Sequence, residues 1–499
     1  MAFPLRFLSS LLLCLLALLL HGAAVTSGCF SMEREALLDF KAGIHDTHNR
    51  LSSWVGQDCC AWEGVICGAT TGHVVMLDVR NTNITDDWAL RGERMNSSLL
   101  ALSHLEHLDL SFNDFSGIRM PEFVGSFKKL RYLNLSFTSF MGGIPARLGN
   151  LSSLYVLDLS YALHFTSHVD NLDWLSHLTS LKHLDLSGLK LTGTPDWFSS
   201  VNMLPSLQVL SMSSVGLDTI PASVVHVNFT SSLTVLDLSI NNFDSTLPKW
   251  LWNISGLTHL GLTQMKELYM SDNQLTGNLS GWLEQMTNLI TLDLSYNLFN
   301  GSMPSSSVGK LSNLTELYLG GNSLGGAISE VQLENLTSLQ VLDLYDNSIT
   351  ISIGQSWVPP FQLRLVDLTK CQLGPQFPEW LQFQTQIIEL FLKDCKIAGT
   401  MPAWFGNISS STITYLDLSN NQIGGKLPSS FKFTKLETLS LRSNRFDGGL
   451  SSSICQWTYL KFLDLSNNKL FGEIPKRIGD LAGLNNLNLS RNHLQGKIP

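Results

Sequence analysis

The chain has 499 residues, a formal net charge of −9 at pH 7 and only 15% charged residues. No segment concentrates lysine and arginine, which argues against nucleic acid or an anionic membrane surface as a partner. Length alone would suggest about three ordinary domains, but an internal repeat overrides that estimate.

The N-terminal segment MAFPLRFLSSLLLCLLALLLHGAAVTSG has the pattern of a secretory signal peptide. One early arginine precedes an apolar run at 8–20, which is shorter than the roughly 20 residues that span a bilayer. We expect residues 1–27 to be a signal peptide, so that the mature chain enters the secretory pathway. No later stretch approaches about 18 consecutive apolar residues, and the sequence therefore predicts no membrane anchor.

The pattern L-x-x-L-x-L recurs along the rest of the chain. Its spacing is 23 to 27 residues, apart from one step of 32, and this is the period of a leucine-rich repeat. Because side chains alternate along a strand, the leucines of L-x-L point inward and their neighbours outward. The pattern predicts an α/β leucine-rich-repeat solenoid, a curved superhelix with one short parallel strand per repeat on its concave face and 3-10 or loop returns on its convex face. Sixteen full motifs begin at residues 105, 130, 154, 181, 207, 233, 265, 289, 314, 339, 363, 387, 413, 436, 460 and 484.

The ninth position of the repeat is asparagine in ten of the sixteen motifs. We call this position the ladder position and the residue there the ladder residue. A stacked asparagine can satisfy backbone groups where each strand ends. Cys371 and Cys395 hold this position in adjacent repeats, where buried thiols are expected because a disulfide between side-by-side parallel positions would be strained. The asparagines are Asn113, Asn241, Asn273, Asn297, Asn322, Asn347, Asn421, Asn444, Asn468 and Asn492, and four consecutive repeats depart from them with Thr138, Ala162, Leu189 and Val215.

The stretch LGGNSLGGAI at 319–328 contains G-x-S-x-G, a pattern that exposes a nucleophilic serine in some hydrolases. Such a serine needs a helix directly after it and an acid and a histidine downstream. Here Asn322 is the ladder residue and Leu324 the next core residue, so Ser323 is expected to be an outward turn residue. No nucleophile, acid and base converge in any motif, and we predict that the chain is not an enzyme and needs no cofactor.

Two places should interrupt the regular stack. A motif at Leu257 is followed only eight residues later by the one at Met265, which predicts a repeat that has lost its outer half. At the last motif, Leu484, Leu487 and Leu489 should be partly uncovered, because each repeat buries its apolar face only against its neighbours.

After the ladder position many repeats read L-x-G-x-I-P or a variant, as in SFMGGIPARLGNLSSL and NNKLFGEIPKRIGDLAGL. This resembles the plant-specific leucine-rich repeat. The segment at 29–79, beginning CFSMEREALLDFKAGI, resembles the N-terminal cap of plant receptor-like proteins, in particular the fungal-xylanase-receptor type. The resemblance implies a cap at 28–73, an array of about 17 repeats at 74–499, and an extracellular recognition ectodomain that signals through partner receptor kinases.

The family continues with further repeats, a non-repeat island, a membrane helix and a short cytoplasmic tail. This sequence stops at Pro499 midway through a repeat, which predicts a chain truncated within the array. We expect it on the extracellular side of the plasma membrane if the full-length product carries a membrane helix, and secreted otherwise. Two alternatives stay open: a soluble apoplastic inhibitor of a microbial cell-wall-degrading enzyme, and a truncated product without a signalling role.

Four cysteines lie in the cap, and a secreted context makes two disulfides the expectation, with three possible connectivities. The family resemblance favours Cys29 with Cys59, which leaves Cys60 with Cys67. The histidine pairs His104/His107 and His164/His168 have metal-like spacing, but no carboxylate or third ligand accompanies them at useful spacing, so surface histidines are expected.

Twelve N-x-S/T sequons are candidate glycosylation sites. Most fall outside the strands. Asn150, Asn253 and Asn335 lie four residues before a strand motif, where glycans would shield the convex side, whereas Asn134 and Asn488 fall on strands. The sequons are Asn83, Asn96, Asn134, Asn150, Asn228, Asn253, Asn278, Asn300, Asn313, Asn335, Asn407 and Asn488.

Most repeats keep serine at the seventh, outward position. Only the repeats beginning at 314, 339, 363 and 387 depart from it continuously, and they add aromatic and charged residues nearby. Strands about 4.8 Å apart would join these side chains into one patch on the concave face. Aromatic groups beside paired charges suit a protein or peptide ligand in the apoplast. The predicted ligand-binding residues are Tyr318, Tyr345, Asp346, Lys370, Phe391, Lys393 and Asp394.

Overall fold

The structure is a computed structural model that consists of two compact units, Met1–Leu207 and Gln208–Pro499. The predicted signal peptide lies outside the described residues. The described residues are 29–83, 88–95, 97–164, 167–191, 196–222, 224, 227–228, 232–251, 264–280, 283–303, 308–408, 411–427 and 433–498.

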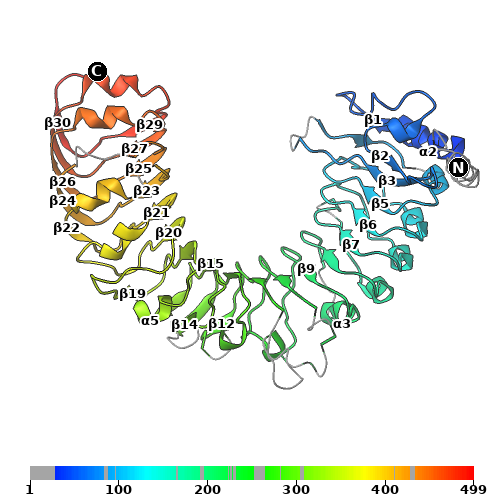
Figure 1. Cartoon of the computed structure of the whole chain (residues 1–499), viewed down its shortest axis with the longest axis horizontal. Helices are drawn as coiled ribbons and strands as arrows, with labels where there is room; N and C mark the ends of the chain where they lie inside the picture. The colour runs from blue at the N-terminus through cyan, green and yellow to red at the C-terminus, as the bar shows by residue number, and fades with distance from the viewer. Residues whose placement is uncertain are drawn as a thin grey trace, which may run out of the picture. The chain divides into compact units, whose positions relative to one another are not determined.

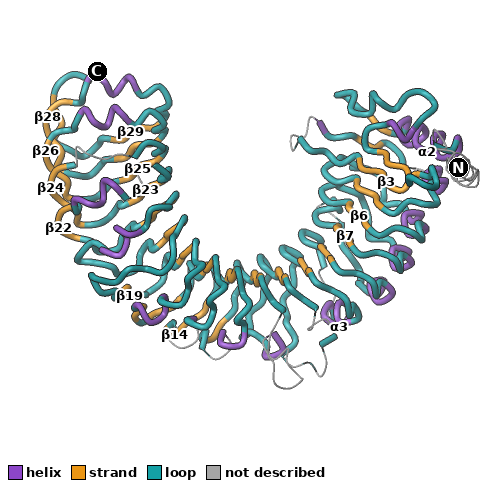
Figure 2. Tube along the Cα trace, viewed as in Figure 1, coloured by secondary structure: helices purple, strands orange, loops and turns teal. Residues whose placement is uncertain are grey.

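The first unit contains the cap and a parallel sheet (Figures 1 and 2). Helix α2 (Ser31–Ala42) and the 3-10 turn η1 (Cys59–Ala61) precede β2 (Val65–Cys67), which pairs antiparallel with β3 (Val74–Asp78). β3 then starts a parallel sheet in which each strand is the in-register neighbour of the next. Its further strands are β5 (His107–Asp109), β6 (Tyr132–Asn134), β7 (Val156–Asp158) and β8 (His183–Asp185).

Short helical returns connect these strands. They are η3 (Ser97–Ala101), η4 (Glu122–Ser126), η5 (Ala146–Asn150), η6 (Asp173–His177) and α3 (Trp197–Asn202), while β1 (Ile44–His45) and β4 (Arg91–Gly92) form a separate antiparallel pair.

The second unit repeats the same arrangement over twelve parallel strands. They are β9 (Val209–Ser211), β10 (Val235–Asp237), β11 (Glu267–Tyr269), β13 (Thr291–Asp293), β15 (Glu316–Tyr318), β18 (Val341–Asp343), β20 (Leu365–Asp367), β21 (Glu389–Phe391), β23 (Tyr415–Asp417), β25 (Thr438–Ser440), β27 (Phe462–Asp464) and β29 (Asn486–Asn488). Its returns are η7 (Lys249–Leu251), η8 (Leu283–Gln285), α5 (Glu330–Leu333), η9 (Glu379–Phe383), η10 (Ala403–Asn407), η11 (Ser452–Gln456) and η12 (Lys476–Asp480).

Shorter parallel sheets run beside the main one, built from residues that follow the ladder position. The longest has five strands and is formed by the last repeats. These strands are β12 (Thr276–Gly277), β14 (Leu298–Ser302) and β16 (Ser323–Gly325), then β17 (Ala327–Ile328) and β19 (Thr350–Ile351), then β22 (Ala398–Thr400), β24 (Gln422–Lys426), β26 (Arg445–Gly448), β28 (Lys469–Glu473) and β30 (His493–Gln495).

All sixteen predicted motifs form a strand at their third to fifth residues, which confirms the solenoid. The motif leucines are buried in every interior layer; Leu314, Leu317 and Leu319 are each at most 1% exposed. β10 pairs directly with β11 across the 32-residue step, and the predicted motif at Leu257 lies outside the described residues. At the last strand Leu487 is 39% exposed, which confirms the expected uncovering.

The ladder asparagines bridge neighbouring repeats. Asn347 donates from Nδ2 to the carbonyl oxygens of Leu344 in its own repeat and Leu319 in the preceding one, at 3.1 and 2.9 Å. Its Oδ1 accepts the backbone N–H of Leu324, also in the preceding repeat, at 2.9 Å. One side chain thereby satisfies backbone groups that two strand ends leave buried, as the sequence predicted.

Cysteine replaces asparagine twice in this ladder. Cys371 and Cys395 are buried free thiols, as expected, and their Sγ atoms contact the carbonyl oxygens of Leu344 and Leu368 at 3.2 and 3.0 Å. A thiol has no equivalent of the amide oxygen; instead the backbone carbonyl of Cys395 accepts the N–H groups of Leu373 and Gly374. Burial raises the pKa of Cys371 to about 12, so this thiol stays protonated.

The eighth position, just before the ladder, has a left-handed backbone in all sixteen repeats, with φ between 49° and 72°. Only Gly188 and Gly321 are glycines there. Other residue types at such a φ cost roughly 1–2 kcal/mol each, and the cost is greatest for bulky side chains. The turn requires this conformation so that the ninth side chain can point inward.

We predict that Asn347→Ala lowers the free energy of unfolding by about 2 kcal/mol, because it leaves a buried N–H and buried carbonyls unpaired. Ser323→Ala should change it by less than about 0.5 kcal/mol, since Ser323 is exposed. Urea unfolding followed by circular dichroism measures both. Equal effects of the two substitutions would contradict the bridging role of the ladder.

Candidate ligand-binding site

The predicted ligand-binding residues lie together on the outward face of four adjacent strands, β15, β18, β20 and β21. The fifth residues of these motifs are in-register neighbours: Tyr318 pairs with Asp343, Asp343 with Asp367, and Asp367 with Phe391. We call the seven predicted residues the four-repeat patch: Tyr318, Tyr345, Asp346, Lys370, Phe391, Lys393 and Asp394.

Two of the patch's charged residues contact each other directly. Lys370 Nζ lies 2.7 Å from Asp346 Oδ1, and both side chains are about half exposed. Both residues occupy the strained eighth position of their repeats. Lys393 and Asp394 are exposed to solvent in the next repeat. The structure therefore places two basic and two acidic groups on one accessible surface.

The aromatic part of the patch includes residues that the sequence did not single out. The ring of Phe391 packs on Tyr415 of the next strand, with centroids 4.6 Å apart. The ring of Tyr345 meets Tyr296, two repeats earlier, edge to face at 5.5 Å. Tyr318 is held by its own strand, because its hydroxyl donates to Glu316 at 3.3 Å. Tyr296 and Tyr415 escaped notice because each lies one repeat outside the block that lacks serine.

Gly320 and Gly321 explain how two tyrosines from non-adjacent repeats can meet. A Cβ atom on Gly320 would lie 2.1 Å from the Tyr345 ring, and one on Gly321 would lie 3.0 Å from Tyr296. The intervening repeat must therefore present bare backbone at both positions. The first glycine of the G-x-S-x-G motif, Gly321, and the glycine before it thus allow the tyrosines to pack, and Ser323 itself is exposed in β16, as predicted.

Two carboxylates, Asp343 and Asp367, lie at the fifth positions between Tyr318 and Phe391. Burial, together with the nearby carboxylates of Asp367 and Asp293, raises the pKa of Asp343 to about 7, although the backbone N–H of Tyr345 opposes the shift. Burial likewise raises the pKa of Tyr318 to about 12, with Glu316 adding to it. Near neutral pH, Asp343 therefore carries less negative charge than its sequence suggests.

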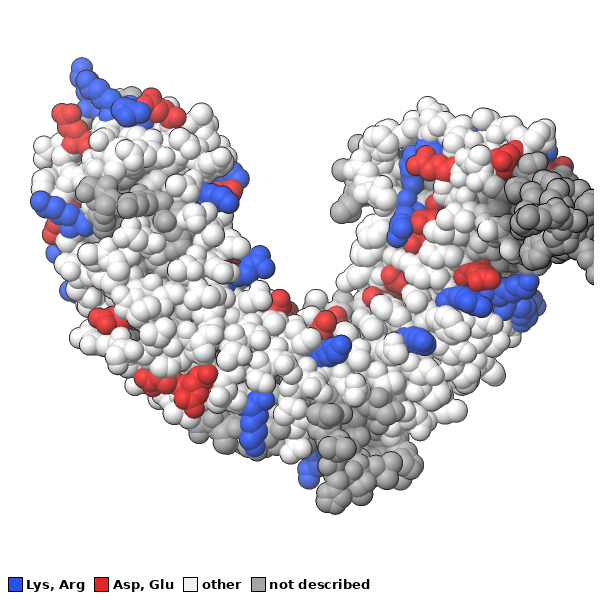
Figure 3. All heavy atoms as spheres, viewed as in Figure 1, with Lys and Arg blue, Asp and Glu red and all other residues white. Residues whose placement is uncertain are grey.

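Charge elsewhere on the surface is sparse and mixed. Figure 3 shows lysine and arginine in small groups, several of them beside aspartate or glutamate, on the face in view. In the second unit a comparable ion pair joins Lys461 to Glu437 at 2.6 Å, away from the four-repeat patch.

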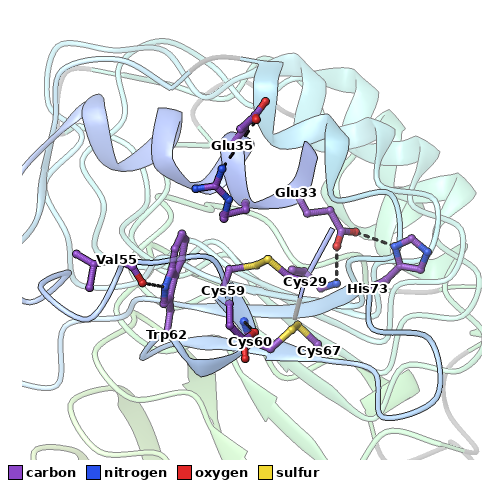
Figure 4. Close-up of a disulfide and its surroundings, with 12 residues drawn as sticks. Cys29, Glu33, Glu35, Val55, Cys59, Cys60, Trp62, Cys67 and His73 are labelled. Carbon is purple, nitrogen blue, oxygen red and sulfur yellow. Dashed lines mark hydrogen bonds and ion pairs between the residues drawn. A yellow bond between two sulfur atoms is a disulfide. The ribbon is translucent and has the colours of Figure 1, made fainter. Parts of the chain in front are cut away.

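The cap is closed by two disulfides (Figure 4). Cys29 is joined to Cys59 and Cys60 to Cys67, each with a Cα–Cα distance of 5.5 Å, and these are the pairings that the resemblance favoured. The buried carboxylate of Glu33 on α2 contacts His73 Nδ1 at 3.0 Å and accepts the N–H of Val74 at 3.1 Å. These contacts fix α2 against the first strand of the sheet.

Arg50 connects the cap to the ladder. Its guanidinium donates to the side-chain oxygen of Asn113 at 2.9 Å and to the carbonyls of Val79 and Arg80 at 2.9 and 2.7 Å. The repeat that contains β3 has no ladder asparagine, and Arg50 satisfies some of the carbonyls that it leaves. No sequence pattern signals this contact, because it joins residues that lie 29 or more positions apart.

The expectation that no carboxylate accompanies the first histidine pair is wrong. Folding places Asp78 of β3 and Asp109 of β5 beside His107, and Glu33 beside His73 and His104. Arg80 already neutralises the first group, at 3.0 Å from Asp78 and 3.8 Å from Asp109. In the second group the rings of His73 and His104 stack in parallel at 3.9 Å, so their in-plane lone pairs do not converge on one ion.

The predicted glycosylation sites differ in solvent exposure. Asn134 on β6 and Asn488 on β29 are half-buried, and Asn134 Oδ1 accepts the N–H of Ser136 at 2.8 Å. Asn96 and Asn253 lie outside the described residues. The exposed sites are Asn83, Asn150, Asn228, Asn278, Asn300, Asn313, Asn335 and Asn407.

Comparison with known protein families supports the same architecture. The leucine rich repeat N-terminal domain matches residues 30–68. Leucine-rich-repeat profiles match residues 263–324 and six further segments, from 129–151 to 459–481.

Two similar curated proteins are from tomato, Solanum lycopersicum. Receptor-like protein EIX1 is 29% identical and receptor-like protein EIX2 31% identical, each over 84% of this chain and 55% of its own length. The chain thus spans about half the length of the curated relatives it matches.

Two similar solved structures are receptor-kinase ectodomains of Arabidopsis. That of GASSHO1/SCHENGEN3, solved in complex with CASPARIAN STRIP INTEGRITY FACTOR 2, has a TM-score of 0.71 and 26% identity, over 93% of this chain and 56% of that one. That of HAESA, solved with the peptide hormone IDA and the co-receptor SERK1, has a TM-score of 0.63 and 26% identity, over 94% and 87%.

The fold, the N-terminal cap and the similar proteins together define the chain as an extracellular leucine-rich-repeat ectodomain of a non-enzymatic kind. The chain belongs to the plant leucine-rich-repeat receptor-like proteins, as the sequence resemblance predicted. Within the described residues, none of the helices has the length and apolar character needed to cross a membrane.

The pKa of Asp343 predicts a pH dependence of stability. The folded-state value of about 7 lies above the unfolded value of roughly 3.9, so the folded state holds the proton more tightly. This contribution to stability is fully present below about pH 4 and is lost as the pH rises through about 7. Asp343→Asn cannot ionise and should lose less stability than wild type between pH 4.5 and 7.5, measured as the urea midpoint. The exposed Asp272→Asn is the control, and equal pH profiles of wild type and Asp343→Asn would contradict the prediction.

Proposed function

We propose that the chain is the ligand-recognition ectodomain of a plant receptor-like protein and that a protein or peptide ligand in the apoplast binds the four-repeat patch. The observation that carries the proposal is the Lys370–Asp346 ion pair beside exposed Lys393 and Asp394 and the half-buried rings of Tyr345 and Phe391. Aromatic side chains are enriched where proteins bind one another, and charged groups beside them steer association and select among partners.

The outward residues of the other repeats favour this location. Most interior repeats present the same small serine at the seventh position, often held by the preceding aspartate, as Ser295 is by Asp293. A repeated polar pattern offers little to distinguish one ligand from another. The four-repeat patch is the place in the second unit where four consecutive repeats present different chemistry, so it can provide specificity.

Signalling would follow through a partner receptor kinase, in defence or in development. The HAESA ectodomain was solved with both a peptide hormone and a co-receptor, which supports a similar division of roles here. We place the protein on the extracellular side of the plasma membrane if the full-length product carries a membrane helix, and as a secreted protein otherwise; the similarity to receptor-like proteins supports an extracellular location.

The test uses the triple variant Lys370→Ala/Phe391→Ala/Lys393→Ala. The first ligand tried is a fungal xylanase, which the family resemblance suggests, followed by synthetic apoplastic peptides. We expect the Kd of whichever ligand binds to rise at least tenfold, or about 1.4 kcal/mol, with the thermal unfolding midpoint unchanged.

Lys461→Ala is the matched control, because it removes an ion pair of the same length and similar exposure from the same unit. Binding that is equally tight in the triple variant and the wild type would contradict the proposed site. If the chain binds the xylanase and blocks its hydrolytic activity without engaging a co-receptor ectodomain, the inhibitor interpretation replaces the receptor one.

A further inference from the structure

The first unit carries an exposed column of aromatic rings that the fold does not require. Phe112, Phe137 and Tyr161 occupy the eighth position of three consecutive repeats. Their rings stack on one another, with centroids 4.7 and 4.9 Å apart and interplanar angles of 9° and 20°. They are 36%, 44% and 42% exposed. We call these three residues the aromatic strip.

Neither the backbone conformation nor burial explains why aromatic residues occupy these three positions. Their φ angles are 55°, 52° and 49°, a left-handed conformation that bulky residues rarely adopt. Most other repeats fill the same position with residues that adopt it more readily or expose no apolar surface, such as Asn420, Ser214 or Asp272, and the exposed apolar residues Ile240 and Tyr296 occur there singly and not in consecutive repeats. Three consecutive aromatic residues that are both strained and exposed point to a surface kept for contact with another molecule.

The aromatic strip ends at Tyr161, because the next repeat has a glycine at the eighth position. Tyr161 lies against Gly188 of the next repeat, where a Cβ atom would come within 2.4 Å of its ring. The column therefore stops after three rings, and the ring of Tyr161 covers the backbone of Gly188.

A pair of carboxylates lies on the same strands as the end of the strip. Asp158 of β7 and Asp185 of β8 are in-register neighbours. Burial, opposed by bonds from Ser160 and increased by Asp185, raises the pKa of Asp158. None of the ion pairs among the described residues includes either carboxylate, in contrast to Asp109, which lies near Arg80. The two carboxylates can therefore accept a cation from outside.

His183 of β8 lies near Asp158 and lowers the pKa of that carboxyl, opposing the effect of burial, whereas the lysine and arginine side chains of this face lie elsewhere. Arg131 and Lys182 lie over the two sides of the Tyr155 ring, at 6.0 and 5.4 Å from its centroid. All three residues are at the second position of their motifs, across the strands from the eighth position. They do not neutralise the carboxylate pair, and they provide a second exposed aromatic group that serves as an internal comparison.

We propose that the aromatic strip and the Asp158–Asp185 pair form a second recognition surface, which binds an extended peptide segment carrying alternating apolar and basic side chains. An extended chain directs successive side chains to opposite sides, with side chains of one side roughly 7 Å apart, so a segment that runs between the strip and the carboxylate pair directs its apolar side chains to the rings and its basic side chains to the carboxylates. An apolar side chain can then lie against the ring edges while a lysine or arginine reaches the carboxylates. The carboxylates disfavour an anionic membrane as the occupant.

The probe is a fluorescein-labelled decapeptide in which leucine and arginine alternate, and the control peptide has glutamate in place of each arginine. Binding is measured by fluorescence anisotropy in about 50 mM salt, where exposed charges are weakly screened. The protein is deglycosylated first, because the sequon at Asn134 lies on the same face. We expect the arginine peptide to bind at least tenfold more tightly than the glutamate peptide.

Two variants test the two halves of the surface. Phe112→Ser/Phe137→Ser/Tyr161→Ser uses a residue that already occupies the eighth position at Ser214 and Ser443. Asp158→Ser/Asp185→Ser uses the residue found at the fifth position at Ser211 and Ser440. Each should weaken binding of the arginine peptide at least tenfold. The thermal midpoint of the first variant should stay the same or rise, because serine relieves strain that the rings impose.

Tyr155→Ser is the matched control, since it removes an aromatic group of equal exposure (41%) from the same face. It and the Lys370→Ala/Phe391→Ala/Lys393→Ala variant should bind the probe like wild type, which separates this surface from the four-repeat patch. Absence of binding to the wild type, unchanged binding in the strip variant, or a fall in its thermal midpoint that matches its loss of binding would each overturn the proposal.

Discussion

The hydrogen bonds that each ladder asparagine makes to the preceding repeat hold neighbouring repeats together. Asn347 joins Leu319, Leu324 and Leu344, and the nine other ladder asparagines, from Asn113 to Asn492, also bond a carbonyl of the preceding repeat. A repeat buries its leucines only against neighbours, so its strand end would otherwise contain buried, unpaired backbone groups. One amide side chain removes that penalty for two repeats at once and so fixes the strands in register.

The geometry of the ladder also determines the chemistry of the surface. For the ninth side chain to point inward, the eighth residue must take a left-handed backbone and project toward solvent. Every repeat thus presents an eighth residue whose identity the core does not restrict. Both proposed surfaces use this freedom: the second unit places Asp346, Lys370 and Asp394 there, and the first unit places Phe112 and Phe137 there.

The candidate site could be located from the sequence, but its composition could not. Loss of serine at four consecutive seventh positions marked the patch, because outward positions recur with a known period. Tyr296 and Tyr415 join it from flanking repeats, and the raised pKa of Asp343 depends on the burial that the neighbouring strands impose. The position of an aromatic residue within its repeat does not predict which other ring it contacts, because side chains reach across one or two repeats.

The sequence by itself determined the solenoid, its sixteen motif strands, the inward leucines and the ladder, because each follows from a local pattern with a fixed period. It also carried the resemblance that placed the chain among plant receptor-like proteins. The tertiary structure alone determined the side-chain contacts that do not recur from one repeat to the next. It brought Arg50 to Asn113, Asp78 to His107 and Tyr345 to Tyr296, and it left Asp158 and Asp185 without an ion pair among the described residues. These contacts join side chains that are far apart in sequence, and their energies depend on burial and distance, which a repeat pattern does not contain.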